Sequence, residues 1–229
     1  EQAQKLGHTS TLYVTEPQIE AARRLAEIAP GNLNRSFFSN SGTEAIDTAI
    51  MLACIHTGRS EVIALRSGYH GRSTLATNLT GLSSWRPLAS SLPNIKHAVA
   101  PYPYRCKFDA NCEDQCAEKC AQDLEEVILT TTNGKPAAFL AETIQGAGGF
   151  VAPPPGYHQR AAEIIRGFGG VLIIDEVQAG FGRTGRWFGI EHWGVVPDIM
   201  VMAKGIAGGM PVGATITTDE IAASWTSKT

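Results

Sequence analysis

The chain has 229 residues, of which 43% are hydrophobic and 18% are charged, which is enough material for one large folded domain. With 19 Lys and Arg against 22 Asp and Glu, the net charge is −3, so no strong field favours nucleic acid or an anionic membrane surface. No window of about 18 apolar residues exists, which excludes a membrane span. We therefore expect a globular protein whose partners include neither nucleic acid nor a membrane.

Strand-like apolar runs alternate with amphipathic, helix-like runs along the chain. The predicted strands are Ser36–Ser39, Val62–Leu65, Ile95–Ala98, Ala138–Glu142, Val171–Asp175, Ile199–Ala203 and Val212–Thr217. The predicted helices are Pro17–Ile28, Thr43–His56, Cys112–Leu129, Gly156–Arg166 and Thr218–Trp225. This alternation favours an α/β fold with a mostly parallel, seven-stranded sheet and helices on both faces, in which ligands bind at the carboxyl ends of the strands.

Four of the five cysteines lie close together, at Cys106, Cys112, Cys116 and Cys120. The last three recur at every fourth residue of a predicted helix and would form one stripe on it. Because this spacing matches none of the usual zinc or iron–sulfur patterns, we favour a packing or surface stripe of thiols over a metal site. Reduced thiols fit the cytoplasm, with the mitochondrial matrix as the alternative.

Two segments match part of a nucleotide-binding motif, namely Val171–Gln178 and Gly180–Gly185. The first is similar to the metal-binding strand of a nucleotide triphosphatase, but the chain has no G-x-x-x-x-G-K-[ST] phosphate loop. The second matches G-x-G-x-x-G after a strand, but no clear helix follows it, and Asp198 precedes the next strand instead of ending it. We therefore expect these glycines to form a turn.

Two loops could receive a flat, phosphorylated ligand. Ser41, Gly42 and Thr43 lie between a strand and a helix, where small residues expose the first helix N–H groups to an anion, although an ordinary N-cap would look the same. Tyr69, within Gly68-Tyr-His-Gly71, could stack on a ring, although a loop tyrosine more often serves packing.

Two charged residues end predicted apolar strands. Asp175 is a carboxylate at the end of a buried run, and Lys204 follows Asp198-Ile-Met-Val-Met-Ala. We expect the Lys204 amine to be desolvated with a lowered pKa, as suits a Schiff-base lysine; a snorkelling surface lysine is the alternative. Together with the two loops, these residues are the parts needed to hold pyridoxal 5′-phosphate, with Asp175 pairing with the pyridinium nitrogen.

At these positions the sequence resembles the class III, subgroup II aminotransferases, within fold type I of the pyridoxal-phosphate enzymes. The motifs that carry the resemblance are Ser39-Asn-Ser-Gly-Thr-Glu-Ala45, Gly68-Tyr-His-Gly71, Glu142-Thr-Ile-Gln-Gly146, Asp175-Glu-Val-Gln-Ala-Gly-Phe-Gly-Arg-Thr-Gly185 and Met202-Ala-Lys-Gly205. They extend over essentially the whole chain. The resemblance is to the branch of alanine–glyoxylate aminotransferase 2 and related ω-amino acid enzymes.

The resemblance implies a role for each matching residue and requires no metal. Lys204 would hold the cofactor covalently and move the proton between substrate carbon and cofactor, and Glu142 would support the site. The other cofactor-binding residues would be Ser41, Gly42 and Thr43 at the phosphate, Tyr69 and Val177 on the two ring faces, Asp175 at the ring nitrogen and Gln178 at the phenolic oxygen.

The implied activity is transfer of an amino group from an amino acid of the alanine or ω-amino acid type to a 2-oxo acid such as glyoxylate or pyruvate. A mutase, decarboxylase or racemase on the same scaffold is the first alternative, and a truncated, non-catalytic cofactor-binding domain is the second. Family members acting on ornithine-like substrates carry a second Glu where this chain has Gln145-Gly-Ala147-Gly-Gly149, which disfavours an ornithine-type gate.

The resemblance also bears on domain organisation. We expect residues 1–229 to form the cofactor-binding large domain, without the family's N-terminal segment and C-terminal small domain, where the arginine that grips the substrate carboxylate lies. Because the family's sites form between two subunits, we expect a homodimer or homotetramer.

Overall fold

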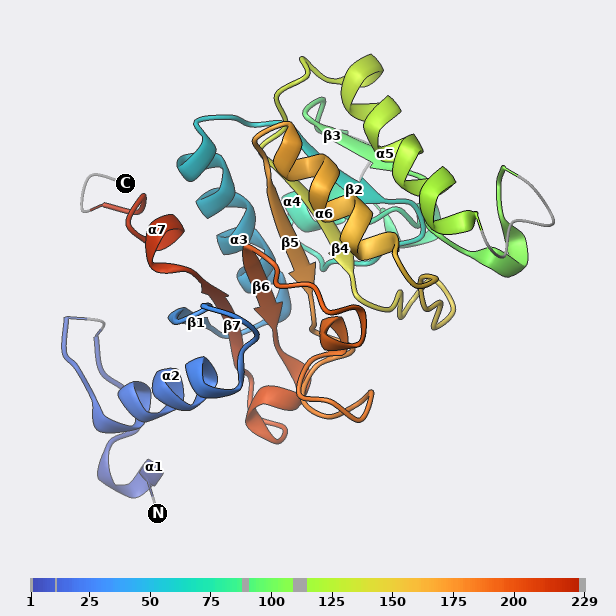
Figure 1. Ribbon diagram of the computed structural model, residues 1–229. Helices are drawn as coiled ribbons and strands as arrows, with labels where there is room; N and C mark the ends of the chain where they lie inside the picture. The colour runs from blue at the N-terminus through green and yellow to red at the C-terminus, as the bar shows by residue number, and fades with distance from the viewer. Residues whose placement is uncertain (1, 11, 88–90, 109–114, 227–229) are drawn as a thin grey trace.

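The computed structural model describes residues 2–10, 12–87, 91–108 and 115–226 (Figure 1). Its centre is one seven-stranded sheet with the order β1-β7-β6-β5-β4-β2-β3. The strands are β1 (Arg35–Ser39), β2 (Val62–Leu65), β3 (Ile95–Ala98), β4 (Ala138–Glu142), β5 (Val171–Asp175), β6 (Ile199–Met202) and β7 (Gly213–Thr217). The pairs β2/β3, β2/β4, β4/β5 and β5/β6 are parallel, whereas β7 runs antiparallel to both β1 and β6. The predicted mostly parallel, seven-stranded sheet is confirmed.

Seven α-helices and four 3₁₀ turns connect the strands within the described residues. The helices are α1 (Gln2–Lys5), α2 (Glu16–Ile28), α3 (Gly42–Thr57), α4 (Thr74–Leu79), α5 (Cys116–Thr131), α6 (Tyr157–Gly167) and α7 (Asp219–Ala222). The 3₁₀ turns are η1 (Ser83–Trp85), η2 (Pro103–Arg105), η3 (Gly189–Trp193) and η4 (Lys204–Ala207).

Four helices differ from the prediction, and the first of them, α1, was not predicted at all. Helix α4 was not predicted, because its sequence Thr-Leu-Ala-Thr-Asn-Leu has little amphipathic pattern; it starts because the Ser73 hydroxyl accepts a hydrogen bond from Ala76 N at 3.0 Å. The predicted helix Thr218–Trp225 is only the short α7. Helix α5 begins at Cys116, and Cys112 lies outside the described residues.

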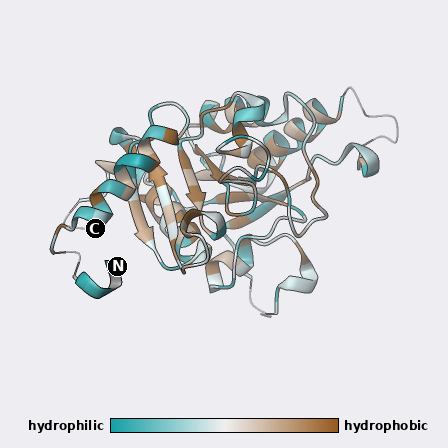
Figure 2. Ribbon diagram, turned by 90° about the horizontal axis from the view of Figure 1, so that it is seen from below, coloured by the Kyte–Doolittle hydropathy of each residue, from teal (hydrophilic) through white to brown (hydrophobic). Residues whose placement is uncertain are grey.

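The helices cover both faces of the sheet, which buries its strands from two sides. Along β5, Leu172 and Ile174 pack into the core that contains α5 and α6, while Val171 and Ile173 pack into the core that contains α3 and α4. Figure 2 shows the result, with brown strands inside and helices that carry teal residues outside. Such two-sided burial explains why the strand sequence is continuously apolar.

The cysteine stripe serves packing where it is described. Cys116 and Cys120 are fully buried on α5, with their Sγ atoms 3.9 Å apart, and Cys106 is half-buried beside the same core. Within the described residues, no group of three or more His, Cys, Asp or Glu side chains is arranged to hold a metal ion.

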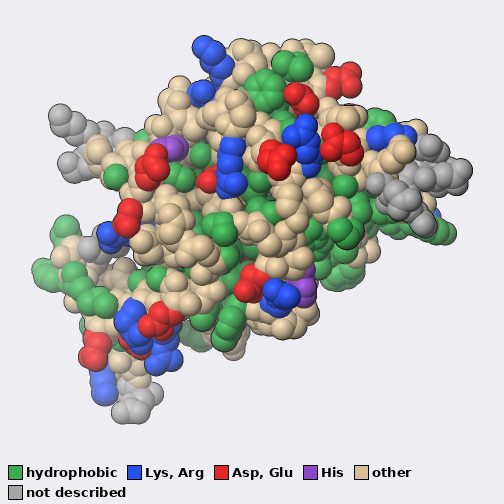
Figure 3. Space-filling model, in the orientation of Figure 1, with side chains coloured by type: hydrophobic (Ala, Val, Ile, Leu, Met, Phe, Trp, Pro, Cys, Tyr) green, Lys and Arg blue, Asp and Glu red, His purple; other side chains and the backbone are tan. Residues whose placement is uncertain are grey.

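The outer surface carries charges of both signs. Lys, Arg, Asp and Glu side chains are interspersed over the face in Figure 3, in keeping with the net charge of −3. In the part of the chain that the structure describes, no helix is both long and apolar enough to cross a membrane.

Candidate cofactor site

The carboxyl ends of β4, β5 and β6 meet the loops that follow β1 and β2 around one cavity. Its volume is about 480 Å³, within the range of small-molecule sites. The predicted site residues that line it are Gly42, Thr43, Tyr69, Glu142, Asp175, Val177, Gln178 and Lys204. The fold therefore brings together side chains that are up to 162 positions apart in the sequence, from Gly42 to Lys204.

The start of α3 forms one side of the cavity. Glu44 N donates to Ser41 Oγ at 3.2 Å, and Glu44 Oε2 accepts from Ser41 Oγ at 3.0 Å and from Asn40 N at 2.9 Å. The Ser41 hydroxyl thus caps the helix, as the alternative interpretation expected, and only Gly42 and Thr43 face the cavity. The first turn of this 16-residue helix still offers an anion the positive end of the helix dipole.

Two glycines allow neighbouring segments to approach this turn closely. A Cβ on Gly42 would lie 3.1 Å from Val177 Cγ2, and a Cβ on Gly71 would lie 2.4 Å from Thr43 Oγ1. Gly71 also has a φ of 131°, which L side chains rarely adopt. The backbone around the expected phosphate position is therefore compact and leaves little room for side chains.

Asp175 lies in the floor of the cavity and is paired with His70. The two residues are 4% and 3% exposed, and His70 Nδ1 lies 2.9 Å from Asp175 Oδ2. The other carboxylate oxygen accepts from Val177 N at 2.9 Å. Within the described residues His70 Nε2 has no hydrogen-bond partner, although it is buried. The pair fixes the orientation of the carboxylate that faces the cavity.

Glu142 is the neighbour of Asp175 in the parallel β4/β5 register, so both side chains project from the same face of the sheet. Its carboxylate accepts from Tyr69 N at 2.9 Å and from Gly146 N at 2.8 Å. Burial raises the pKa of Glu142, the charge of His70 opposes that shift, and the charge of Asp175 adds to it. Glu142 therefore ties two loops of the cavity together through their backbone.

Lys204 follows β6 in the turn η4 and has a φ of 45°. Its side chain is exposed and its Nζ donates to Gln178 Oε1. The prediction of a desolvated amine is wrong for this structure, because β6 ends two residues earlier, at Met202, and the turn directs the side chain into an open cavity.

The cavity has lining residues that the sequence-based prediction did not include. They are His70, Gly71, Trp85, Gly146, Ala147 and Phe150. The Trp85 ring contacts Tyr69 edge-on, with centroids 4.9 Å apart and an interplanar angle of 68°. His70 could have been found, since it lies beside Tyr69 in a motif already singled out. Trp85 and Phe150 carry no local signal.

Glu176 follows Asp175 and points to the opposite side of the strand end. It is fully buried, and its carboxylate accepts from Thr143 Oγ1 at 2.6 Å, Gly189 N at 3.0 Å and Ile190 N at 2.7 Å. Burial raises its pKa to about 7. Glu176 thus anchors the segment that closes the Gly180–Gly185 turn, which forms no helix, as predicted.

The residues of the cavity fit pyridoxal 5′-phosphate. A primary amine, a buried carboxylate held by an imidazole, an aromatic ring and the start of a long helix converge on one space. These groups complement an aldehyde, a pyridinium nitrogen, a flat ring and a phosphate, respectively. The close approaches at Gly42 and Gly71 keep the phosphate end free of side chains.

The comparisons with known proteins agree on one family. The family model "Aminotransferase class-III" matches residues 1–229. The chain is 42% identical to alanine–glyoxylate aminotransferase 2 homolog 2 of Arabidopsis thaliana, over 96% of the chain and 45% of that protein. It is 43% identical to acetylornithine aminotransferase of Methanopyrus kandleri, over 97% of the chain and 52% of that protein. A leucine/methionine racemase of Thermococcus litoralis is 38% identical over 96% of the chain and 50% of its own length.

Solved structures of transaminases have the same fold as this chain. An ω-transaminase from Thermomicrobium roseum superposes with a TM-score of 0.91 at 37% identity, covering 97% of this chain and 52% of that one. The ω-transaminase of Pseudomonas jessenii, solved in complex with PMP, superposes with a TM-score of 0.91 at 33% identity. The match covers 97% of this chain and 51% of that one. The chain spans about half the length of the curated relatives it matches.

Proposed function

The chain belongs to the class III aminotransferases, and from this premise we propose that it is the cofactor-binding large domain of a pyridoxal-phosphate-dependent transaminase. The reaction would move an amino group from an amino acid of the alanine or ω-amino acid type to a 2-oxo acid such as glyoxylate or pyruvate. The observation that carries the proposal is the placement of the Lys204 amine in the same cavity as the buried Asp175–His70 pair.

Several residues of the cavity have a part in this proposal. Bound pyridoxal 5′-phosphate supplies an electron sink for negative charge that develops at the substrate carbon. Asp175 would face the ring nitrogen and hold it protonated, while Gly42 and Thr43 would bind the phosphate. Tyr69 and Val177 would enclose the ring.

Lys204 and Gln178 handle the reacting end of the site. Lys204 Nζ donates to Gln178 Oε1, so the amine is held at one place in the cavity. From there Lys204 would attach the cofactor, and, once the substrate amine has displaced it, the same nitrogen would take and return the proton at the substrate carbon. The Gln178 side-chain amide would donate to the cofactor's phenolic oxygen.

A racemase is the second candidate, because one matching relative is a leucine/methionine racemase. Both reactions need the same lysine and the same electron sink, so the cavity alone favours neither. A transaminase requires a 2-oxo acid acceptor, whereas a racemase does not. Product analysis of the full-length protein with and without glyoxylate or pyruvate separates the two.

The direct test of the catalytic assignment is Lys204→Ala in the full-length protein. We expect loss of all measurable turnover, because positioned proton transfer alone contributes roughly 10²–10⁴-fold and the covalent attachment is lost as well. Lys96→Ala is the matched control, since this lysine lies on β3 outside the cavity lining and its Nζ donates to Pro93 O at 2.9 Å. A near-normal rate in Lys204→Ala would overturn the proposal.

We further propose a homodimer or homotetramer that acts in the cytoplasm or in the mitochondrial matrix. The exposed Lys204 side chain supports assembly, since a catalytic amine open to solvent in one chain gains from a second surface that covers it. The compartment is the one expected from the sequence, because five cysteines in a chain of this size favour reduced thiols. Sedimentation of the full-length protein tests the assembly.

A further inference from the structure

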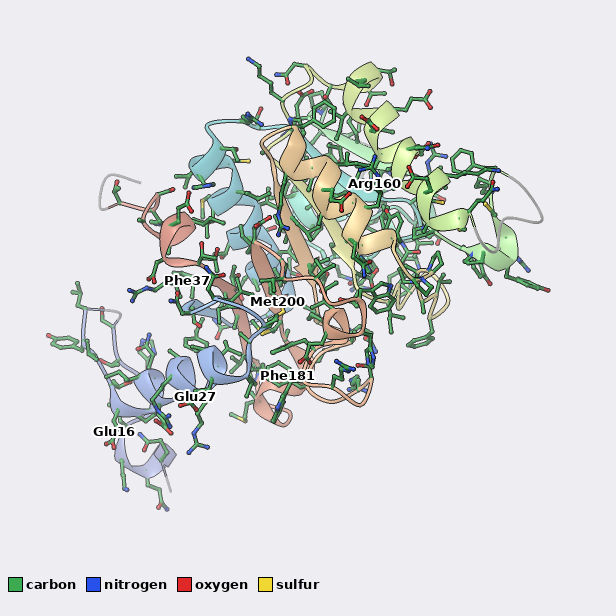
Figure 4. All side chains as sticks on the ribbon, in the orientation of Figure 1. Glu16, Glu27, Phe37, Arg160, Phe181 and Met200 are labelled. Carbon is green, nitrogen blue, oxygen red and sulfur yellow. The ribbon has the colours of Figure 1, made fainter. Side chains whose placement is uncertain are left out.

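Glu142 is a charged side chain of the cofactor cavity to which the chemistry described above gives no step. It is 5% exposed, lines the cavity and is the last residue of β4. Figure 4 shows Phe181 in the loop near the end of the sheet where β5 and β6 finish, and Glu142 lies at this end as well, because β4 is parallel to β5. A buried carboxylate costs free energy unless its oxygens are paired, so its partners indicate what it does.

The two carboxylate oxygens of Glu142 accept hydrogen bonds from two different loops. Oε1 accepts from Tyr69 N at 2.9 Å, in the loop that follows β2, and Oε2 accepts from Gly146 N at 2.8 Å, in the turn that follows β4. A backbone N–H can only donate, so both oxygens must act as acceptors. A side-chain amide at this position could accept from only one loop, and its NH₂ group would face the N–H of the other.

The first loop carries the ring that we place on the cofactor. Tyr69 N is the donor to Glu142, and the Tyr69 ring contacts Trp85 edge-on with centroids 4.9 Å apart. The next residue is His70, whose Nδ1 lies 2.9 Å from Asp175 Oδ2. The bond to Tyr69 N thus holds the backbone from which both the stacking ring and the imidazole extend.

The second loop packs against the residue that holds the lysine. A Cβ on Gly146 would lie 3.0 Å from Gln178 Cγ and 3.5 Å from Glu142 Oε2, so the Gly146 backbone packs closely against both side chains. Gln178 Oε1 in turn accepts from Lys204 Nζ. The turn itself is closed, since Phe150 N donates to Gly146 O at 3.2 Å. The Glu142 carboxylate therefore holds the turn against which Gln178 rests.

We propose that Glu142 is a positioning residue, which sets the spacing between the Tyr69 ring and the Lys204 amine by holding one backbone N–H in each of the two loops. This inference rests on the proposed function, in which Tyr69 lies on the cofactor ring and Lys204 attaches the cofactor. Glu142 acts through the loops and takes no part in the chemical steps. The role requires a carboxylate of this length, since an amide satisfies one loop only and a carboxylate shorter by one methylene loses at least one contact.

The two loops have further contacts that keep them folded without Glu142. Gln145 Nε2 donates to Arg66 O at 2.9 Å, which joins the turn after β4 to the loop after β2. A Cβ on Gly148 would lie 2.8 Å from Ser67 O, so the backbones of the two loops approach closely. We therefore expect variants of Glu142 to fold and to differ from the wild type in the spacing of the two loops.

Amide hydrogen exchange of the cofactor-free, full-length protein measures the two contacts directly. In Glu142→Gln we expect roughly 10-fold faster exchange at Tyr69 N or at Gly146 N, because one of these groups loses its acceptor. Glu176→Gln is the matched control, since Glu176 is likewise a buried carboxylate and its backbone donors lie outside the cavity lining. That variant should leave exchange at both amides unchanged.

Cofactor binding by the full-length protein gives the functional readout. Glu142→Gln should weaken pyridoxal 5′-phosphate binding roughly 10-fold and reduce the visible circular dichroism of the bound cofactor, which reports on the orientation of its ring. Glu142→Asp keeps the charge and changes only the length, so a positioning role predicts a loss of affinity and dichroism in this variant too. Glu176→Gln should bind the cofactor like the wild type.

Two results would overturn the positioning role. One is wild-type exchange at both amides in Glu142→Gln, and the other is wild-type affinity and dichroism in Glu142→Asp, which would show that the charge alone is needed. If Glu142→Gln does not fold, as judged by urea unfolding, exchange and dichroism of Glu142→Asp decide the question. An unmodified Lys204 after borohydride reduction would mean failure of the proposed function, whereas the exchange result reports on the loops without cofactor, so the two failures are distinguishable.

Discussion

Asp175 and Glu176 are adjacent carboxylates at the end of one buried strand, yet they face opposite sides and have different partners. Asp175 faces the cofactor cavity and is paired with the His70 imidazole at 2.9 Å. Glu176 faces away and is held by one hydroxyl and two backbone N–H groups. Burial raises the pKa of Glu176 to about 7.

The comparison shows how a fold separates a chemical carboxylate from a structural one. A buried carboxylate that must stay charged needs a partner able to carry the opposite charge, and His70 is such a partner for Asp175. Neutral donors satisfy the hydrogen-bonding capacity of Glu176 but compensate its charge only in part. The alternation of side chains along a strand is sufficient to place the two groups in these separate surroundings.

The largest expected effect is on catalytic activity, which should fall when Asp175 is changed and change little when Glu176 is changed. In the full-length protein, Asp175→Asn should lower kcat/KM by on the order of 10²–10³, because it removes the negative charge that faces the ring nitrogen. Glu176→Gln, the matched control, should stay within about 10-fold of the wild type. Similar losses in both variants would contradict the distinction.

The second prediction concerns pH and Glu176. Its folded-state pKa of about 7 lies above the ordinary glutamate pKa of 4.5, so between these pH values the folded protein binds more protons than the unfolded chain. The stability contributed by this group is therefore fully present below about pH 4.5 and is lost as pH rises through about 7, by at most about 3 kcal/mol. Urea unfolding of the full-length protein across this range measures it.

The readout for that prediction is the difference between wild type and Glu176→Gln at each pH. This subtraction is needed because His158 also titrates in the range. Burial lowers the pKa of His158 to about 4, so its contribution to stability is lost as pH falls from about 6.5 to 4, whereas that of Glu176 grows as pH falls. The variant should gain stability relative to the wild type as pH rises toward 8. A difference independent of pH would contradict the assignment to Glu176.

The third prediction concerns the partner of Asp175. His70→Phe leaves the buried carboxylate without its imidazole, which should weaken cofactor binding by roughly 10-fold and shift the pH dependence of the bound cofactor's visible spectrum. His70→Asn retains a donor on a shorter side chain and should recover part of the affinity. Unchanged affinity and an unchanged spectral titration in His70→Phe would show that the pair is not required.

The smallest expected effect concerns the strained ring at the cavity boundary. Phe150→Gly should leave the free energy of unfolding within about 1 kcal/mol of the wild type or raise it, because Phe150 is 73% exposed and glycine adopts a φ of 55° without strain. Phe139→Ala on β4 is the control, since this fully buried ring should cost about 3–5 kcal/mol. A loss in Phe150→Gly as large as in the control would show that the ring supports the core.

Most of the sheet was predictable from the sequence, because a strand buried on both faces has a distinctive composition. Val171–Asp175 shows this clearly, since its apolar run and its terminal acid agree with the structure residue for residue. The short helix Thr74–Leu79 was not predictable in the same way, because it is fixed by its cap and its neighbours and not by its own periodicity.

The site was predicted in part for a similar reason. Motifs at strand ends identified Thr43, Tyr69, Asp175 and Lys204, since the fold brings such ends together. The pairing of His70 with Asp175 depends on how the loop after β2 crosses the intervening strand β4, which sequence alone does not specify. The exposure of Lys204 depends on where β6 ends, and β6 ends at Met202, one residue before the predicted Ala203 and two before Lys204.

The central claim is that Lys204 holds the cofactor in the cavity built around Asp175. Reduction of the loaded, full-length protein with borohydride, followed by mass mapping of the modified peptide, tests this claim directly. We predict loss of the cofactor's visible absorbance on reduction and a single pyridoxyl-phosphate adduct on Lys204. An unmodified Lys204, or an adduct at another lysine, would contradict the account.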